Sequence, residues 1–376
     1  MSRTIEGSPR ADGFRLPGEF EPHAGCWLLW PERPDTWRDG ARPAQAAFAA
    51  VASAIAGFEP VTVGASPAQY RNARAMLPPA VRVVELQADD SWMRDTGPSF
   101  VINDAGLVRG VQFDVNAYGG REHGLYAPWE NDRLVATKVL ELERLDRYVA
   151  PLVLEGGAIT SDGTGTLITT LDCVINDNRN PGRSRAAIEA ILRDYLAAET
   201  IVWLPHGLMH DETGGHVDNI VSFVGPGVLL LAWSDDRADP SYERVREAQA
   251  ILSRARDARG RAFEIHKLPL PRPTAMTSAE ASTLTISTDA KARRAGDPVC
   301  ASYINAYVGN GVVVVPTFDD PADEPARALY ARLHLTRRIV QVPARELVLG
   351  GGGIHCITHE QPKPQGIPGR FIQLKS

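Results

Sequence analysis

One pattern recurs along the chain and constrains its fold more than any other feature. An extended apolar run is followed by a Gly-containing turn and then by a second extended run. Runs rich in β-branched and aromatic residues on either side of such a turn are typical of β-hairpins. Four segments of this kind stand at 98–113, 157–171, 219–233 and 302–316. A fifth extended run, at 338–355, closes the series.

Stretches with helical periodicity lie between the hairpins. Apolar residues recur at helical spacing over 43–55, and again over 188–196 in a segment for which Asn180 and Pro181 are typical starting residues. Weaker helical patterns cover about 131–145, 241–255 and 323–333.

The chain is therefore predicted to repeat a β-hairpin-plus-helix unit at irregular spacing. Each unit has an apolar face, and a circular array buries that face against the next unit. We expect a single α/β catalytic domain over 1–376 with its units arranged in a circle, in preference to a Rossmann sheet. An ordinary α+β protein with several hairpins is the alternative.

Composition excludes several classes of protein. With 44% hydrophobic and 23% charged residues, the 376-residue chain has enough apolar material for a large core. The net charge of −6 argues against a nucleic-acid partner. No apolar run reaches the roughly 18 residues of a membrane helix and no signal peptide is apparent, so no membrane partner is expected. Four dispersed cysteines without a CxxC pair favour a cytoplasmic location.

Chemically distinctive residues stand at equivalent places in several units. In a circular array the equivalent ends of the units face one central opening, so side chains far apart in sequence can converge there. These residues are Trp92 and Asp95 before the first hairpin, Glu155 before the second, His216 and Asp218 before the third, and Cys356 after the final run.

Each of these residues also has a purely structural explanation. His216 and Asp218 would share a face at the start of a strand, although most His-x-Asp pairs are structural. The segment around Arg94 fits a tight turn with a local Arg–Asp pair, and Glu155 fits an exposed edge position. A cysteine at a strand end is often a buried structural residue. The preceding glycine run, 350–353, instead favours close approach of a ligand or another chain segment.

Three histidines offer a competing hypothesis. His206, His210 and His216 have the H-x3-H-x5-H spacing of a zinc-protease motif. Gly207 stands where that motif requires Glu, and Pro205 disfavours the helix that would face two histidines toward zinc. A zinc hydrolase is therefore a distant alternative.

Seven segments spread over nearly the whole chain carry a family resemblance. They are WMRDTGP (92–98), NAYGG (116–120), LEGGAI (154–159), NDNRNPG (176–182), DETGGHVDN (211–219), LLLAWSDD (229–236) and LGGGGIHCIT (349–358). Together they resemble the agmatine deiminases, within the guanidino-group-modifying superfamily that also holds arginine deiminases and peptidylarginine deiminases.

The resemblance implies a pseudo-fivefold α/β propeller, or pentein, that works without a metal or organic cofactor. The implied reaction hydrolyses the guanidino group of agmatine, giving N-carbamoylputrescine and ammonia through a covalent thiouronium intermediate. The implied roles are Cys356 as nucleophile, His216 as general acid/base, Asp95 and Asp218 as guanidinium-binding carboxylates, and Glu155 as a supporting carboxylate.

Several positions differ from the family pattern without removing a catalytic group, and they leave the far end of the substrate less defined. These positions are Gly353, His359, Gly214, Met93 and Tyr118. Trp92 is a candidate to pack along an aliphatic stem, and Glu212 or Asp211 to meet a distal amine, although a solvated loop acid is the alternative for both carboxylates. Asp90 and Gly352 complete the candidate substrate contacts.

Two further alternatives concern function. A related deiminase could act on arginine or on a C-terminal peptidyl arginine, whose distal carboxylate would require a cation such as Arg94. A catalytically inactive binding relative is disfavoured because all five catalytic groups are present. The expected partner is a small guanidino compound, and a homodimer or higher homo-oligomer is compatible with the chain.

Overall fold

A three-stranded unit recurs throughout the computed structural model, which describes residues 2–364. In the first unit β5 (Ser99–Asn103) and β6 (Val108–Asp114) form an antiparallel hairpin. Helix α5 (Asp132–Leu142) then leads to β7 (Arg147–Val153), which lies parallel to β6. Such a parallel return needs a long connection, and the helix supplies it.

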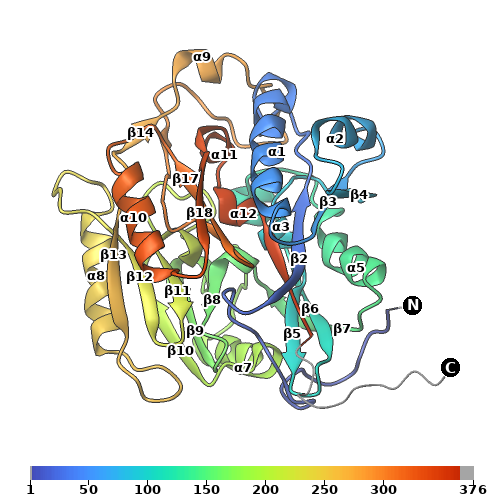
Figure 1. Ribbon diagram of the computed structural model, residues 1–376, viewed down its shortest axis with the longest axis vertical. Coiled ribbons are helices and arrows are strands. Elements are labelled where there is room, and N and C mark those ends of the chain that lie inside the picture. The colour runs from blue at the N-terminus through green and yellow to red at the C-terminus, as the bar shows by residue number, and fades with distance from the viewer. Residues whose placement is uncertain (1, 365–376) are drawn as a thin grey trace.

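Three more units repeat this order of hairpin, helix and parallel strand. Figure 1 shows α5, α7 and α8 at the periphery of the strands. The elements are β8 (Ile159–Ser161), β9 (Thr166–Thr170), α7 (Arg185–Leu196) and β10 (Thr200–Leu204); β11 (Val221–Gly225), β12 (Val228–Trp233), α8 (Tyr242–Arg254) and β13 (Glu264–Pro269); and β16 (Tyr307–Gly309), β17 (Val312–Thr317), α10 (Asp323–Leu333) and β18 (Arg338–Pro343).

A fifth sheet joins segments from the two halves of the sequence. Strand β19 (His359–Pro362) pairs antiparallel with β2 (His23–Leu29), so the hairpin of this unit is replaced by strands more than 300 residues apart. Helix α1 (Arg42–Ala56) then leads to β3 (Val61–Ala65), which lies parallel to β2. This unit thus has the same three-strand pattern, built from β19 near one end of the sequence and from β2 and β3 near the other.

The remaining elements are short. Four short strands remain in the described residues. β1 (Phe14–Arg15) and β4 (Arg82–Glu85) lie at sheet edges, and β14 (Thr274–Ala275) pairs with β15 (Pro298–Val299) in a two-stranded ladder. The other helices are η1 (Asp39–Ala41), α2 (Tyr70–Met76), α3 (Met93–Thr96), α4 (Gly120–His123), η2 (Gly156–Ala158), α6 (Leu171–Val174), η3 (Val217–Asn219), α9 (Ser278–Ala281), α11 (Arg345–Leu349) and α12 (Ile354–Ile357).

All four hairpins predicted from the sequence are confirmed, whereas two other predictions are wrong. The run at 338–355 is extended only in β18, because α11 folds back to bury Leu347 in the core with α1. The helix expected from Asn180 begins at Arg185, capped by the Ser184 hydroxyl. Asn180 instead uses its side-chain amide to bond both backbone groups of Val153 at the end of β7.

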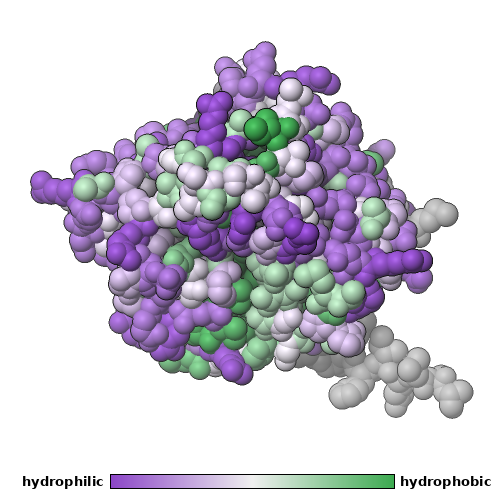
Figure 2. All heavy atoms as spheres, turned by 90° about the horizontal axis from the view of Figure 1, so that it is seen from above, coloured by the Kyte–Doolittle hydropathy of each residue, from purple (hydrophilic) through white to green (hydrophobic). Residues whose placement is uncertain are grey.

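The connecting helices bury one face and leave the other in solvent. In α1 the buried positions include Phe48, Val51 and Ile55, which recur at helical spacing and pack against β3 and β17. The surface seen from above is largely hydrophilic (Figure 2). Over the described residues, the helices are too short or too polar to cross a membrane. The prediction of one domain over 1–376 also covers residues 1 and 365–376, which lie outside the described residues.

The fifth sheet, in which β19 pairs with β2, supplies a test of the fold. A Cβ added to Gly25 in β2 would lie 2.8 Å from the Pro60 carbonyl oxygen, a backbone atom that already accepts the N–H of Cys26. We expect Gly25→Ala to lower the urea midpoint and to cost about 1–3 kcal/mol in the free energy of unfolding. Tryptophan fluorescence during denaturation measures both quantities.

Gly225→Ala is the matched control, because a Cβ on Gly225 meets nothing within 4 Å. That variant should change the free energy of unfolding by less than about 0.5 kcal/mol. Equal midpoints for the two variants would contradict close packing at Gly25.

Candidate active site

The predicted site residues lie on short turns that precede the first strand of successive sheets. Asp95 is in α3 before β5, and Glu155 directly precedes η2 and β8. His216 and Asp218 belong to the turn of η3 before β11, and Cys356 is in α12 before β19. Neighbouring turns α12, α3, η2 and η3 contact one another in that order. All five side chains are buried.

Gly157 marks the point where three of these side chains meet. A Cβ on Gly157 would lie 2.6 Å from His216 Nδ1, 2.8 Å from Asp218 Oδ2 and 2.9 Å from Asp95 Oδ1. The Gly157 N–H donates to the same Asp95 oxygen at 2.9 Å. A side chain at this position would separate the polar groups, so glycine is required for their approach.

The Cys356 thiol lies against an acidic group. Its Sγ is 3.6 Å from Asp218 Oδ2 and accepts the side-chain N–H of Asn305 at 3.2 Å. Burial, followed by the negative charges of Asp218 and Asp95, raises the pKa of Cys356 well above its ordinary value. The resting group at neutral pH is therefore the thiol.

Asn305 is a site residue that the sequence analysis missed. It lies just before β16, separated from that strand by Ala306, in the turn of the fourth sheet that corresponds to the turns of Asp95, Glu155 and His216 in the others. Besides its bond to Cys356, it accepts the backbone N–H of His355 at 2.9 Å. Its place near the start of the predicted hairpin segment 302–316, ahead of β16, was a signal that could have identified it.

His355 supplies positive charge beside the thiol. Its Nδ1 lies 2.9 Å from Asp218 Oδ2, and its Nε2 lies 3.0 Å from Glu19. Burial and Arg94 oppose protonation, but the two carboxylates outweigh them and raise the pKa of His355 to about 9. His355 is consequently cationic at neutral pH, and its contact lowers the pKa of Asp218 even though burial acts in the opposite direction.

His216 lies between two carboxylates without bonding either one. Nδ1 is 3.8 Å from Asp95 Oδ1 and Nε2 is 4.0 Å from Glu155 Oε2, while neither ring nitrogen has a hydrogen-bond partner. Burial lowers its pKa, but nearby negative groups, Asp95 first, raise the net value well above the ordinary one. The expected strand start is wrong here: the residues after His216 form a 3-10 turn, because Asp211 accepts the His216 N–H at 2.9 Å and fixes the loop.

A buried arginine keeps Glu155 ionised. Arg179 Nε donates to Glu155 Oε1 at 2.7 Å, and both side chains are almost fully buried. Burial opposes the charge on Glu155, but Arg179 and His216 lower the pKa of the carboxyl below its ordinary value. The NDNRNPG segment contained Arg179, although the sequence analysis assigned no role to it.

Asp95 differs from Glu155 in the direction of its pKa shift. Burial raises the pKa of Asp95 above its ordinary value, against the effect of His216 and of the Tyr118 hydroxyl, which donates to Asp95 Oδ2 at 2.7 Å. Tyr118, noted only as a departure from the family pattern, is therefore a direct partner of a predicted site carboxylate.

The Trp92 ring lies close to the Cys356 thiol. A Cβ on Gly352 would lie 2.6 Å from the Trp92 ring and 3.1 Å from Cys356 Sγ, so ring and sulfur face the same short piece of backbone. Asp90 accepts the indole N–H groups of Trp92 and Trp37 at 3.1 and 2.9 Å. The structure thus gives Asp90 the task of holding two indole rings.

The two other predicted acidic contacts differ in position. Asp211 accepts bonds within its own loop, including the His216 N–H. Glu212 meets Arg293 at 2.6 Å and Lys291 at 3.3 Å. Burial opposes its charge, but these two cations lower the pKa of Glu212. A Cβ on Gly351 would lie 2.9 Å from Glu212 Oε2. Gly351 adjoins Gly352, whose Cβ position lies against the Trp92 ring.

Two alternatives from the sequence are wrong. His206 is half exposed and bonds Asp172 at 2.7 Å, and in the described part of the chain the only group with metal-ligand geometry that contains His216 lacks both His206 and His210. Arg94 makes no local pair with an aspartate. It bonds Glu360 at 2.6 Å and lies 3.6 Å from Glu19.

The chain belongs to the Porphyromonas-type peptidyl-arginine deiminase family, which matches residues 15–362. It is 55% identical over 360 residues to an agmatine deiminase of Pseudomonas aeruginosa (strain LESB58), covering 95% of this chain and 98% of that protein. It is 53% identical over 366 residues to an agmatine deiminase of Pseudomonas fluorescens (strain Pf-5), covering 97% and 100%. The solved agmatine deiminase of Enterococcus faecalis superimposes with a TM-score of 0.95 at 43% identity, covering 97% and 100%.

The Tyr118 contact makes a testable prediction about pH. Loss of a hydrogen bond to a charged acceptor costs about 1.5–3 kcal/mol, which raises the carboxyl pKa by roughly one to two units. Tyr118→Phe should therefore raise the pKa of Asp95. It should also shift the acidic limb of the kcat/KM profile to higher pH, as the prediction that ionised Asp95 binds a guanidinium requires. The profile can be measured with agmatine, the substrate in the names of these relatives.

Tyr126→Phe is the matched control, since the Tyr126 hydroxyl bonds Asp132 and its ring packs on Tyr118. It should leave the acidic limb in place. An unmoved limb in Tyr118→Phe, or equal shifts in both variants, would contradict the assignment of this contact to Asp95.

Proposed function

We propose that this protein hydrolyses agmatine to N-carbamoylputrescine and ammonia. The observation that carries the proposal is the meeting of an imidazole and two carboxylates around Gly157, with a buried thiol 3.6 Å from one of those carboxylates. Identity of 55% to an agmatine deiminase over nearly the whole chain supports the same reaction. Cys356, His216, Asp95, Asp218 and Glu155 carry it out.

Asp95 and Asp218 bind the guanidinium group. A guanidinium is planar and permanently charged, and two carboxylates on either side accept its N–H groups in charge-assisted bonds. Both carboxylates face the Gly157 position, and Asp218 also lies 3.6 Å from the thiol. The guanidinium carbon is thereby held near Cys356 Sγ.

The reaction divides into two steps at that carbon. The Cys356 thiol loses its proton to solvent as the guanidinium binds, and the thiolate sulfur forms a bond to the carbon. His216 then protonates the nitrogen that leaves as ammonia when its C–N bond breaks. His216 then takes a proton from water, whose oxygen attacks the thiouronium carbon. The C–S bond breaks, and the proton of the new hydroxyl passes to the departing sulfur, which restores the Cys356 thiol and leaves the ureido product. Glu155 and Asp95 favour the protonated form of His216, which is needed before the first step and is regained in the second.

Glu212 is the candidate contact for the distal ammonium of agmatine. Its Oε2 lies near Gly351, next to the backbone that separates Trp92 from Cys356. Lys291, whose side chain is 49% exposed, lies 3.3 Å from the other oxygen. The substrate ammonium replaces this lysine amine, while Trp92 packs along the four-carbon stem. Arg94 is already paired with Glu360, so it offers no free cation to an arginine carboxylate.

The five sheets close radially as a pseudo-fivefold α/β propeller of the pentein type, forming one domain. The joining of β19 with β2 supports this closure, because the last strand completes the first sheet. The protein is cytoplasmic and works as a homodimer or higher homo-oligomer.

Turnover of guanidino compounds tests the proposal. Agmatine should be converted to ammonia and N-carbamoylputrescine far faster than free arginine or a C-terminal arginyl peptide. Cys356→Ala should lose activity by about 10³-fold or more, because the covalent route is removed. Coupled ammonia measurement and mass spectrometry of the product provide the readouts.

Cys300→Ala is the control for loss of a cysteine elsewhere in the chain and should keep most of the activity. The proposal is wrong if no guanidine in the panel is turned over, or if Cys356→Ala retains full activity.

The ionisation of Cys356 gives a separate prediction. Because buried carboxylates raise the pKa of its thiol, the free enzyme should show no Cys356 thiolate near the ordinary pKa of about 8.5. A bound guanidinium reverses the local field and lowers that pKa. Thiolate absorbance against pH, taken as the difference between the native chain and Cys356→Ser, measures the effect with and without an unreactive alkylguanidine.

A titration of the free thiol well below about 8.5, with no further decrease when the alkylguanidine binds, would contradict substrate-assisted ionisation.

A further inference from the structure

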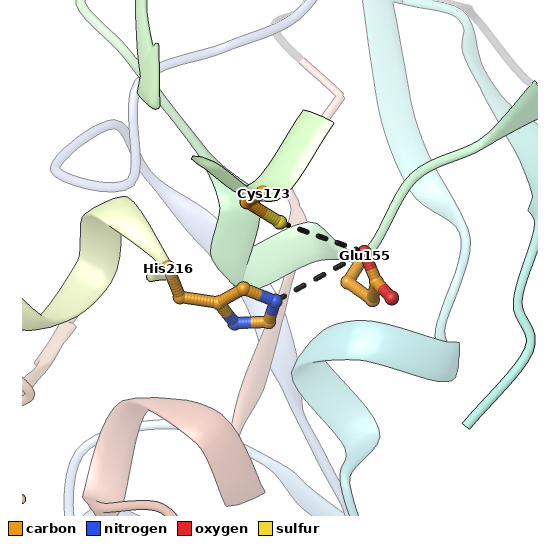
Figure 3. Close-up of side chains that lie close together, drawn as sticks. All are labelled: Glu155, Cys173 and His216. Atoms are coloured by element: carbon orange, nitrogen blue, oxygen red, sulfur yellow. Dashed lines mark hydrogen bonds and ion pairs between the residues drawn. The ribbon is translucent and has the colours of Figure 1, made fainter. Parts of the chain in front are cut away.

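A second buried thiol lies on the Nε2 side of the His216 imidazole, whereas Asp95 lies on the Nδ1 side. Cys173 is in α6 and is fully buried. Its Sγ is 3.9 Å from Glu155 Oε2, and the same oxygen is 4.0 Å from His216 Nε2 (Figure 3). The deimination steps use Cys356, so they leave the Cys173 sulfur without a task.

The three side chains present one donor atom each to a common point. Cys173 Sγ, His216 Nε2 and Glu155 Oε2 all lie within 4.8 Å of one another. Figure 3 shows the thiol and the imidazole both directed toward the carboxylate. Glu155 Oε2 is also the oxygen that Arg179 leaves unbonded, because the arginine Nε donates to Oε1.

The imidazole provides independent support for a ligand here. His216 is 0% exposed, yet its Nε2 has no hydrogen-bond partner. A buried ring nitrogen without a partner is costly, and each such group needs an explanation. Coordination of an ion would satisfy it.

We propose that Glu155, Cys173 and His216 form a Zn²⁺ site, and that an ion bound there inhibits the enzyme. The binding part stands on these three residues alone. The inhibition part rests on the proposed role of His216 in deimination.

The donor set and its spacing fit zinc. One thiolate, one imidazole and one carboxylate are all common zinc ligands in tetrahedral sites, at roughly 2.3, 2.0 and 2.1 Å from the ion. Ligands at those distances lie roughly 3.3–3.7 Å apart. The two separations from Glu155 Oε2, 3.9 and 4.0 Å, need only a small contraction, and Cys173 Sγ and His216 Nε2, which lie within 4.8 Å, approach each other as the ion binds. Magnesium and calcium prefer sets made of oxygen and would not recruit the sulfur.

Charge is balanced when protons leave. Burial raises the pKa of Cys173, so the free site holds a thiol, and His216 carries a proton on each nitrogen. Binding releases the Cys173 thiol proton and the His216 Nε2 proton to solvent, two per ion, leaving Nδ1–H in place. A thiolate and a carboxylate then neutralise the Zn²⁺ charge, and affinity should increase with pH.

The bound ion would stop turnover through the imidazole. Zinc on Nε2 holds His216 as a neutral ring that cannot become imidazolium. Donation of the remaining Nδ1 proton to the leaving ammonia would leave a metal-bound imidazolate, which is an unfavourable product of the step. The ion also removes Glu155 as the carboxylate that supports the cationic ring.

Inhibition and direct binding test the site together. Agmatine turnover is measured against free Zn²⁺ in the native chain, in Cys173→Ala and in Cys300→Ala, each relative to its own metal-free rate. We expect inhibition of the native chain that EDTA reverses. The Zn²⁺ concentration for half inhibition should increase by about tenfold or more in Cys173→Ala and stay at the native value in Cys300→Ala.

Binding is followed separately with Co²⁺ in the inactive Cys356→Ser variant, which retains all three proposed ligands. A thiolate-to-cobalt charge-transfer band, with two protons released per ion, is expected there. That band should be absent from Cys173→Ala in the same background.

Native zinc sensitivity in Cys173→Ala, or absence of the cobalt band from Cys356→Ser, would overturn the site. A band that is present in the native chain but absent from Cys356→Ser would assign the metal-binding thiol to Cys356. Because the cobalt measurement needs no turnover, a chain that binds Co²⁺ through Cys173 but does not hydrolyse agmatine would refute the proposed function and leave the metal site standing.

Discussion

The carboxylates of Asp95 and Asp218 are buried on either side of the Gly157 backbone, and much of the surrounding structure compensates for their charge. An isolated buried carboxylate becomes protonated unless a partner stabilises it. Asp218 has such a partner in the cationic ring of His355. Asp95 has weaker ones, a phenol and a backbone N–H, and burial raises its pKa even though both of these donors lower it. The two groups that face one ligand thus differ in how firmly they hold their charge.

The same compensation connects the site to the fold. Arg94 is the neighbour of Asp95 in α3, and its guanidinium bonds Glu360 in β19 at 2.6 Å. Cys356 lies in α12, only a few residues before that strand. A buried ion pair therefore connects the turn that holds Asp95 to the strand that follows Cys356. Since β19 is completed by β2, the position of Cys356 depends on pairing between opposite ends of the sequence.

The sequence predicted the repeated hairpins because alternation and turn chemistry are local, and it predicted the main site residues because they differ from their apolar surroundings. It did not predict partners whose role depends on contact. Asn305 is an ordinary amide until it is seen 3.2 Å from Cys356 Sγ. Arg179 is one arginine among many until Glu155 meets it in the interior. The loop before β11 was misjudged for a related reason, since Asp211 reaches forward to the His216 N–H and produces a turn where alternation suggested a strand.

Selection for a cation has a further physical consequence. A guanidinium and a divalent metal ion are both attracted by buried carboxylates, so charge alone cannot separate them. What separates them is geometry and donor softness. The Gly157 side offers oxygen atoms to a flat cation with N–H groups on several edges. The other side of His216 offers a sulfur, a nitrogen and one oxygen around a point, which suits a small tetrahedral ion.

His216 is shared by both sides, and its Nδ1 and Nε2 face them separately. Occupation of Nε2 therefore changes what Nδ1 can do, and one ring couples two cation sites that do not share a carboxylate.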